Sequence, residues 1–236
     1  MQHEYRGREL TVSILFSAAG VAQHILVSRD SDIILVDCGD GCLRDLLDHN
    51  IPPDSISALT FTHGHFDHMG GLHSLLGFLR MIGRTEPLPI HAPEGCTEVF
   101  ATVHNFRRCY PESIPYRIPL LELKPHEPFN VGSVTVEGYA VTHAGSTAAG
   151  ITDPIPALGY RITAGPESVA ITGDTGLCEE VRALVTDTDF AVIEATFPDT
   201  DCRPPETFEK VHLTEEMARE LGALARNYVL VHGALR

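Results

Sequence analysis

Three histidines and an aspartate stand within seven residues, in the stretch Thr62-His63-Gly64-His65-Phe66-Asp67-His68, directly after the apolar run 56–61. Imidazole and carboxylate are the ligands that zinc and its first-row neighbours prefer, so this density of donors predicts a metal site. His63 and His65 lie two apart and would point the same way in an extended chain, while Asp67 and His68 follow as the chain turns. One pair could hold one ion and the next pair a second, or all four donors could fill one ion.

Further polar residues come at the ends of predicted apolar strands. A strand over 133–142 delivers His143, one over 168–172 leads to Asp174, one over 190–194 ends on Glu194, and one over 227–231 delivers His232. Open sheets place ligand sites at the carboxyl ends of strands, because loops there can converge without burying unpaired backbone. These side chains are therefore expected to converge with His63 and His65.

The elements that must position these donors follow from the spacing of apolar residues. Strands are predicted over 10–16, 24–28, 33–37, 57–62, 88–91 and 158–163, and helices over 42–49, 71–82, 94–106, 179–185 and 213–225. In the helix 71–82, Leu72, Leu75, Leu76, Leu79 and Ile82 form one apolar face, and Thr214 is the expected N-cap of the last helix. The segment 144–156, rich in Gly, Ala, Thr and Pro, is predicted to be a flexible loop.

Composition places the chain among folded globular proteins. With 236 residues, 43% hydrophobic and 21% charged, it is expected to form a single domain over 1–236. No apolar run is long enough to cross a bilayer and the first ten residues are polar, so no membrane contact and a cytoplasmic location are expected. The six cysteines are widely spread and read as reduced thiols, and Cys38 with Cys42 is expected to be buried and structural rather than metal-binding.

The charge of the chain restricts its partners. The formal net charge is −15, and among 17 basic residues only Lys124 and Lys210 are lysines. Such a chain repels polyanions, so extended nucleic-acid binding would need a local basic patch or a partner. The pairs Arg80 with Arg84 and Arg107 with Arg108 could form that patch, or they could be solvated helix faces. A homodimer is compatible with the sequence.

The residues named so far resemble the metallo-β-lactamase superfamily. The stretch 62–68 fits the HxHxDH signature of that superfamily, and His143, Asp174 and His232 follow in the order of its remaining ligands. The resemblance is strongest to the ribonuclease Z branch and its phosphodiesterase relatives. It rests on Asp37-Cys38-Gly39-Asp40-Gly41 with Arg44 and Leu46-Leu47, on Gly70-Gly71-Leu72, and on Glu194-Ala195-Thr196-Phe197 with His212-Leu213-Thr214.

The resemblance implies a fold and a set of ligands. The fold would be α+β, a four-layer αβ/βα sandwich with two mixed sheets face to face and helices outside, built from halves of about 1–138 and 139–236. The resemblance also implies two divalent ions, with zinc expected and manganese or iron as alternatives. His63, His65 and His143 would hold one ion, Asp67, His68 and His232 the other, and Asp174 would bridge them.

The implied chemistry is hydrolysis. Two ions about 3.5–4 Å apart can share a hydroxide and stabilise the attacking and leaving oxygens of a displacement at phosphorus. Asp67 could also orient or deprotonate the water, and Glu194 with His212 could support the ligands or give a proton to the leaving oxygen. His212 could equally be ordinary polar surface at a helix N-terminus. The remaining histidines, including His73, are expected to have no role in the site.

The expected function is therefore a dinuclear metal-dependent hydrolase, a phosphodiesterase of the ribonuclease Z kind. Enzymes of that branch that process transfer RNA carry an inserted basic arm, whereas the segment 144–171 holds one arginine, Arg161, and no lysine. This difference favours a small or short single-stranded phosphodiester as the substrate. Two alternatives stay open: a carboxylic-ester, lactone or thioester hydrolase of the same fold, and a metal-binding module without turnover.

Overall fold

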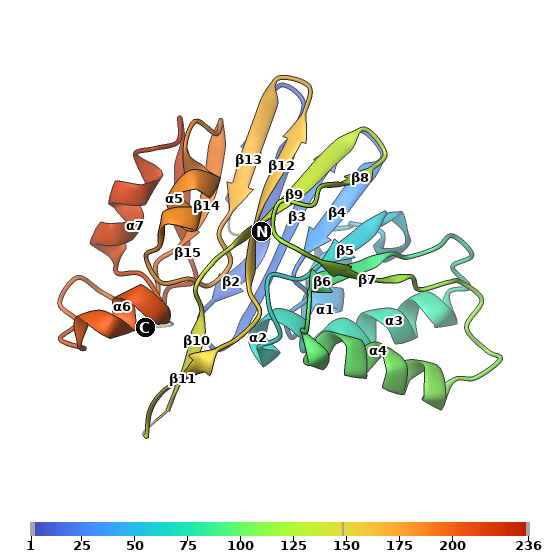
Figure 1. Ribbon diagram of the computed structural model, residues 1–236. Helices are drawn as coiled ribbons and strands as arrows, with labels where there is room; N and C mark the ends of the chain where they lie inside the picture. Colours follow the sequence, from blue (N-terminus) through green and yellow to red (C-terminus); the bar gives the residue numbers. More distant parts are fainter. Residues whose placement is uncertain (1–2, 148, 235–236) are drawn as a thin grey trace. The chain divides into compact units, whose positions relative to one another are not determined.

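The chain divides into two compact units in the computed structural model, which describes residues 3–147 and 149–234. The first unit contains Thr11–Leu123 and the N-terminal strand, drawn from blue to green in Figure 1. The second unit contains Gly7–Leu10 and the chain from Lys124 onward, and this latter part is drawn from yellow-green to red. The single domain over 1–236 stays a prediction.

The first unit is built on a seven-stranded mixed sheet in the order β1-β2-β3-β4-β5-β6-β7. The strands are β1 (His3–Arg6), β2 (Thr11–Ala18), β3 (Ala22–Arg29), β4 (Asp32–Val36), β5 (Ala58–Thr60), β6 (Ile90–Pro93) and β7 (Leu120–Leu123). Strands β1 to β4 pair antiparallel and β4 to β7 pair parallel. The parallel half requires crossover connections, and these carry the helices α1 (Cys42–Asp48), α2 (Phe66–Met69), α3 (Leu72–Met81) and α4 (Thr97–Cys109), with a short 3₁₀ helix at Pro53–Ser55.

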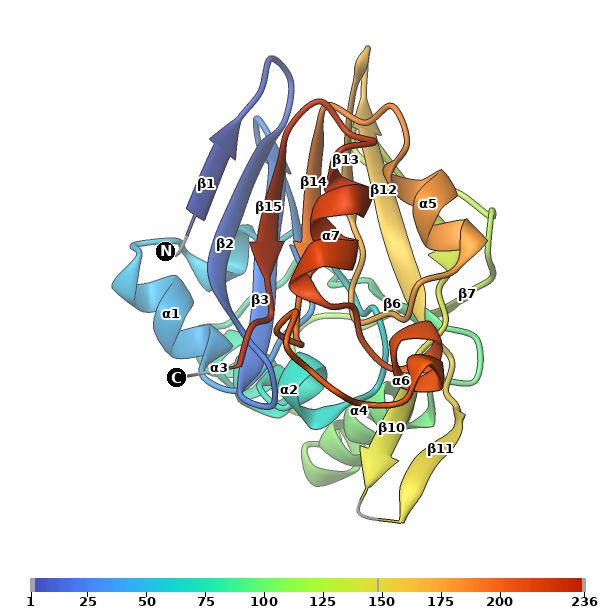
Figure 2. The ribbon, with the colours of Figure 1, turned by 90° about the vertical axis from the view of Figure 1, so that its left-hand side faces the viewer.

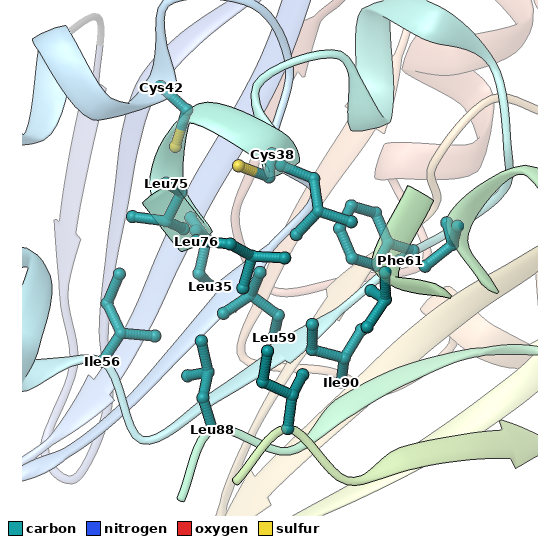
Figure 3. Close-up of a cluster of buried hydrophobic side chains, with 14 of the residues drawn as sticks. Leu35, Cys38, Cys42, Ile56, Leu59, Phe61, Leu75, Leu76, Leu88 and Ile90 are labelled. Atoms are coloured by element: carbon teal, nitrogen blue, oxygen red, sulfur yellow. The ribbon is translucent and has the colours of Figure 1, made fainter. Parts of the chain in front are cut away.

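One apolar cluster joins the helices α1, α3 and α4 to one face of this sheet. Leu72, Leu75, Leu76 and Leu79 are fully buried in it, which confirms four of the five residues predicted for the apolar face. Ile82, the fifth, follows the end of α3 and is exposed. Figure 3 shows Leu75 and Leu76 beside residues of the sheet such as Leu35, Leu59 and Ile90. Burying each such leucine contributes about 1.5–3 kcal/mol, so this cluster anchors α2 and α3 behind the histidine-rich stretch.

Cys38 and Cys42 place their sulfur atoms in the same cluster (Figure 3). Both thiols are free and buried, in agreement with the predicted structural role. The hydrogen bond with Cys38, together with burial, raises the pKa of the Cys42 thiol well above its ordinary value. A thiol of this kind stays protonated at neutral pH and packs as a small apolar group.

The second unit is built on a six-stranded mixed sheet in the order β15-β14-β13-β12-β9-β8. Its strands are β8 (Phe129–Val131), β9 (Val134–Ala140), β12 (Leu158–Ala164), β13 (Glu167–Ile171), β14 (Phe190–Glu194) and β15 (Tyr228–Val231). The helices α5 (Glu179–Val185) and α7 (Glu215–Gly222) pack against it through Val181, Leu184 and Leu221. Figure 2 shows the two helices on the same side of this sheet. The helix α6 (Pro205–Lys210) precedes α7. Because β9 pairs with both β8 and β12, the boundary lies at Leu123–Lys124 and not near residue 138, where the sequence predicted it.

Three local predictions differ from the structure. The segment predicted as a flexible loop over 144–156 forms a two-stranded ribbon, β10 (Ala144–Thr147) and β11 (Gly150–Pro154), because Gly150 at φ 127° allows the turn and β-branched residues follow it. The helix predicted over 94–106 runs over Thr97–Cys109, because Gly95 with φ 80° holds a turn first. The helix predicted over 213–225 begins only at Glu215, and Thr214 caps it as predicted.

Among the described residues, none of the helices has both the length and the apolar character that crossing a membrane requires.

Candidate functional site

The histidine-rich stretch of the first unit leaves β5 and turns into the short helix α2. His65 is the N-cap of α2, and Asp67 and His68 lie within this helix. The turn into α2 therefore brings these three side chains close to one another. The ring centroids of His63 and His65 are 4.7 Å apart, and those of His63 and His68 are 4.0 Å apart. Asp67 Oδ2 lies 4.0 Å from His68 Nε2. The structure therefore gathers all four donors that the sequence predicted for this unit.

Asp37 determines which ring nitrogen the histidines present. Its Oδ2 accepts a hydrogen bond from His68 Nδ1 at 2.8 Å, and Thr62 Oγ1 donates to the same carboxylate at 2.9 Å. Because the Thr62 hydroxyl donates there, its oxygen accepts from His63 Nδ1 at 3.0 Å. Both imidazoles thus carry the proton on Nδ1, and Nε2 is the nitrogen that can bind a metal ion.

Backbone geometry explains why the motif around Asp37 contains a glycine at position 39. Asp37 follows β4 with φ 60°, and its backbone N–H donates to Thr60 O, which directs the carboxylate at the stretch 62–68. A Cβ on Gly39 would lie 2.2 Å from the backbone oxygen of Asp67, so only glycine allows this close approach. Asp67 is held from the other side, since the backbone N–H of Gly20 donates to its Oδ2 at 2.9 Å.

In the second unit, Asp174 lies between two predicted histidine ligands. Its Oδ2 is 3.9 Å from His143 Nε2, and its Oδ1 is 3.4 Å from His232 Nδ1. All three residues are buried and follow strands of the six-stranded sheet, β9, β13 and β15. The structure thus brings together the donors that the sequence predicted for this unit as well.

The histidines of the second unit carry the same tautomer as those of the first. His143 Nδ1 donates to the backbone oxygen of Val211 at 2.8 Å. The hydroxyl of Thr196 donates to Glu194 Oε2 at 2.9 Å and accepts from His232 Nδ1 at 3.0 Å. Nε2 is therefore the nitrogen of both rings that can bind a metal ion. No role was predicted for Thr196 from the sequence, although this residue belongs to the motif 194–197.

Glu194 and His212 form a pair beside these donors. Glu194 is buried and accepts from His212 Nδ1 at 2.9 Å, from Thr175 N at 3.1 Å and from Leu213 N at 3.2 Å, all at Oε1. The His212 side chain keeps 15% exposure, whereas those of His143 and His232 keep 1%. His212 Nδ1 lies 4.0 Å from Asp174 Oδ2. With Nδ1 engaged by the carboxylate, His212 can exchange a proton through Nε2.

The donor chemistry fits divalent metal ions. Each unit presents buried imidazole nitrogens and a buried carboxylate, and buried groups of this kind are stabilised by coordinating a metal. The Nδ1 bonds described above orient the rings in the way that ligand histidines require. The side chains of this chain therefore suit zinc, manganese or iron.

Comparison with known proteins places the chain in a family. A family model described as a beta-lactamase superfamily domain matches residues 33–232, which include every residue of the two donor sets. The chain belongs to the beta-lactamase superfamily. The resemblance that the sequence indicated is thereby confirmed.

Relatives of this superfamily member include a ribonuclease Z of Gemmatimonas aurantiaca, 26% identical over 90% of this chain and 80% of that enzyme. Among solved structures, the short form of human tRNase Z has a TM-score of 0.79 at 21% identity, covering 95% of this chain and 93% of that one. The metallo-beta-lactamase fold protein YhfI from Bacillus subtilis has a TM-score of 0.77 at 19% identity, covering 96% and 87%. The predicted α+β class, the metallo-β-lactamase fold and the class of metal-dependent hydrolase are confirmed.

The arginines that the sequence indicated as a candidate basic patch have structural contacts in this superfamily member. Arg84 is buried, and its guanidinium donates to the backbone oxygens of Asp54, Ile56, Glu86 and Pro87. This side chain is therefore not part of a solvated helix surface. Arg80 lies over the ring of Tyr110 at 4.4 Å and donates to Ser113 Oγ, and Arg107 donates to Ile118 O. Three of the four guanidinium groups therefore hold the first unit together.

Several histidines without a predicted role have other contacts. Burial lowers the pKa of His91 to about 4, and its Nδ1 lies 3.3 Å from Leu59 O. His24 pairs with Asp45 at 2.8 Å, and the ring of His73 meets that of Phe106 edge-on.

Replacing Asp37 with alanine is expected to lower the metal affinity about 10–100-fold, because His68 and Thr62 lose the carboxylate that fixes them. The measurement is competition with a chromophoric chelator. Asp40→Ala is the matched control, since Asp40 belongs to the same motif but is exposed. An affinity that is unchanged in Asp37→Ala would contradict the role given to Asp37.

Proposed function

We propose that this protein is a dinuclear metal-dependent phosphodiesterase that hydrolyses small phosphodiesters. The donors of the two units would act together, with His63, His65 and His143 on one ion, Asp67, His68 and His232 on the other, and Asp174 shared. Family membership and the donor chemistry support this assignment, as does the common tautomer of His63, His68, His143 and His232. When bound, the ions would supply Lewis acidity and an activated water.

The observation that carries the proposal is the pair formed by Glu194 and His212. A ring that is held at Nδ1 by a buried carboxylate, and that keeps solvent access beside Asp174, suits the delivery of a proton from Nε2. Hydrolysis of a phosphodiester forms one phosphorus–oxygen bond to water and breaks one to the leaving alcohol. The departing oxygen is a strong base, so His212 would protonate it as that bond breaks and regain a proton from solvent.

Two features support a small substrate over a folded RNA. The net charge of −15 opposes the approach of a large polyanion. Arg161 is the one basic residue of the segment 144–171, and its guanidinium donates to the backbone oxygens of Ala183, Leu184 and Thr186 at the end of α5. It caps a helix and is not directed toward a nucleic acid.

A substrate panel tests the proposal. We expect the purified protein to hydrolyse bis(4-nitrophenyl) phosphate and cyclic or linear dinucleotides, to lose this activity on chelation, and to regain it with zinc or manganese. Asp174→Asn, prepared in parallel, shows that the activity belongs to this chain. Turnover of lactone, carboxylic-ester or thioester substrates alone would overturn the phosphodiesterase assignment in favour of the carbonyl alternative.

A further inference from the structure

A cavity of about 650 Å³ lies within the second unit, between the β10–β11 ribbon and the segment that leads into α6. The residues that line it are Ser146, Thr147, Gly150, Ile151, Arg203, Pro204, Glu206 and Thr207. Figure 2 shows the ribbon and α6 as neighbouring elements. Its volume lies in the range of about 300–1,000 Å³ that small-molecule sites occupy. None of the metal donors discussed above lines it.

Arg203 connects this cavity to the Glu194–His212 pair. Its guanidinium lies over the ring of Phe197, 4.2 Å from the centroid, and the ring of Phe197 meets that of His212 edge-on at 5.4 Å. Asp201 fixes the guanidinium through Nη1 at 2.9 Å. A group that packs on Arg203 in the cavity would therefore be separated from His212 by the guanidinium and the ring of Phe197.

The lining indicates what kind of group fits. Ile151 and Pro204 offer apolar surface, Ser146, Thr147 and Thr207 offer hydroxyl groups, and the guanidinium of Arg203 offers a flat face. The charge of Arg203 is balanced by Asp201, and the charge of Glu206 is balanced by Lys210 at 2.6 Å, so the lining residues that the structure describes offer no unpaired positive charge for a further phosphate. A neutral molecule with a flat apolar face and a hydroxyl-rich part suits this combination.

We propose that this cavity binds the leaving nucleoside of the substrate, with Arg203 and Ile151 as specificity-determining residues. The inference rests on the proposed function in one respect: because His212 protonates the leaving oxygen, the group beyond Phe197 is the alcohol that departs. A nucleoside has a flat base, a sugar with hydroxyl groups, no charge and a volume that the cavity accommodates. The substrate class is then a nucleotide diester whose alcohol side is a nucleoside.

Binding of adenosine to the purified protein, measured by titration calorimetry, tests this inference. Saturable binding is expected in the wild type, and Ile151→Trp, which fills the cavity, should raise the Kd at least about tenfold. Thr152→Trp is the control, because the next residue of β11 places the same bulk on the opposite face. Arg203→Ala is expected to weaken binding about tenfold, and Arg226→Ala, a change at an exposed surface arginine, is expected to leave it unchanged.

Absence of saturable binding in the wild type, or equal binding by Ile151→Trp, would overturn the inference. Adenosine has no phosphodiester to cleave, so this result does not depend on the proposed function, which the substrate panel tests separately. In kinetics, Ile151→Trp should lower kcat/KM for a dinucleotide at least about tenfold more than for the matching nucleotide methyl ester. Equal losses on the two diesters would likewise contradict a nucleoside site.

Discussion

Asp174→Asn is expected to lower kcat/KM for phosphodiesters by about 10³-fold or more and to reduce the bound metal below the two ions per chain expected of the wild type. The carboxylate lies between His143 and His232, and the proposed function assigns it to both ions. Asparagine keeps its size and hydrogen-bonding capacity but removes the negative charge that offsets two divalent cations. The loss therefore reports coordination and not packing.

Elemental analysis of protein purified without chelator measures the metal content, and steady-state kinetics on bis(4-nitrophenyl) phosphate measures the turnover. Asp48→Asn is a matched control, since it makes the same chemical change at an exposed residue of α1. The unfolding temperature of the metal-free variant should equal or exceed that of the metal-free wild type, because a buried charge has been removed. A variant that retains full metal content and turnover would show that Asp174 bridges no ions.

His212→Asn is expected to lower kcat about 10²–10⁴-fold for a diester with an alcohol leaving group, and less than about tenfold for bis(4-nitrophenyl) phosphate. The asparagine amide can replace the Nδ1 hydrogen bond to Glu194, but it has no proton to give at the position of Nε2. A departing nitrophenolate is a weak base and needs no proton, whereas a departing alkoxide does. The difference between the two substrates isolates proton transfer from structural support.

The pH profile offers a second readout for His212. The fall in kcat at high pH with the alcohol-leaving diester should disappear in His212→Asn, since the group that must be protonated is gone. His104→Asn, at an exposed position of α4, is the control. Equal losses on both substrates with an unchanged profile would assign His212 a structural role only.

The sequence alone predicted the chemistry of the candidate metal donors, because that chemistry depends on residue type and spacing. His63, His65, Asp67 and His68 are close in the chain, and a histidine or aspartate after an apolar strand marks a sheet edge, as at His143 and Asp174. The apolar face of α3 follows from periodicity alone, because its four leucines repeat at helical spacing.

Tertiary structure decided what depends on contacts between distant residues. The tautomers of His63, His68 and His232 are set by Asp37, Thr62 and Thr196, and hydrogen bonds of this kind leave no periodic trace in a sequence. In the sequence Arg84 resembles a surface charge, but in the fold its guanidinium is surrounded by backbone oxygens. The segment 144–156 resembles a loop in composition, but its two halves pair as strands. Residue type therefore determined which metal-binding chemistry is available, while the packing of distant segments determined how each side chain is oriented.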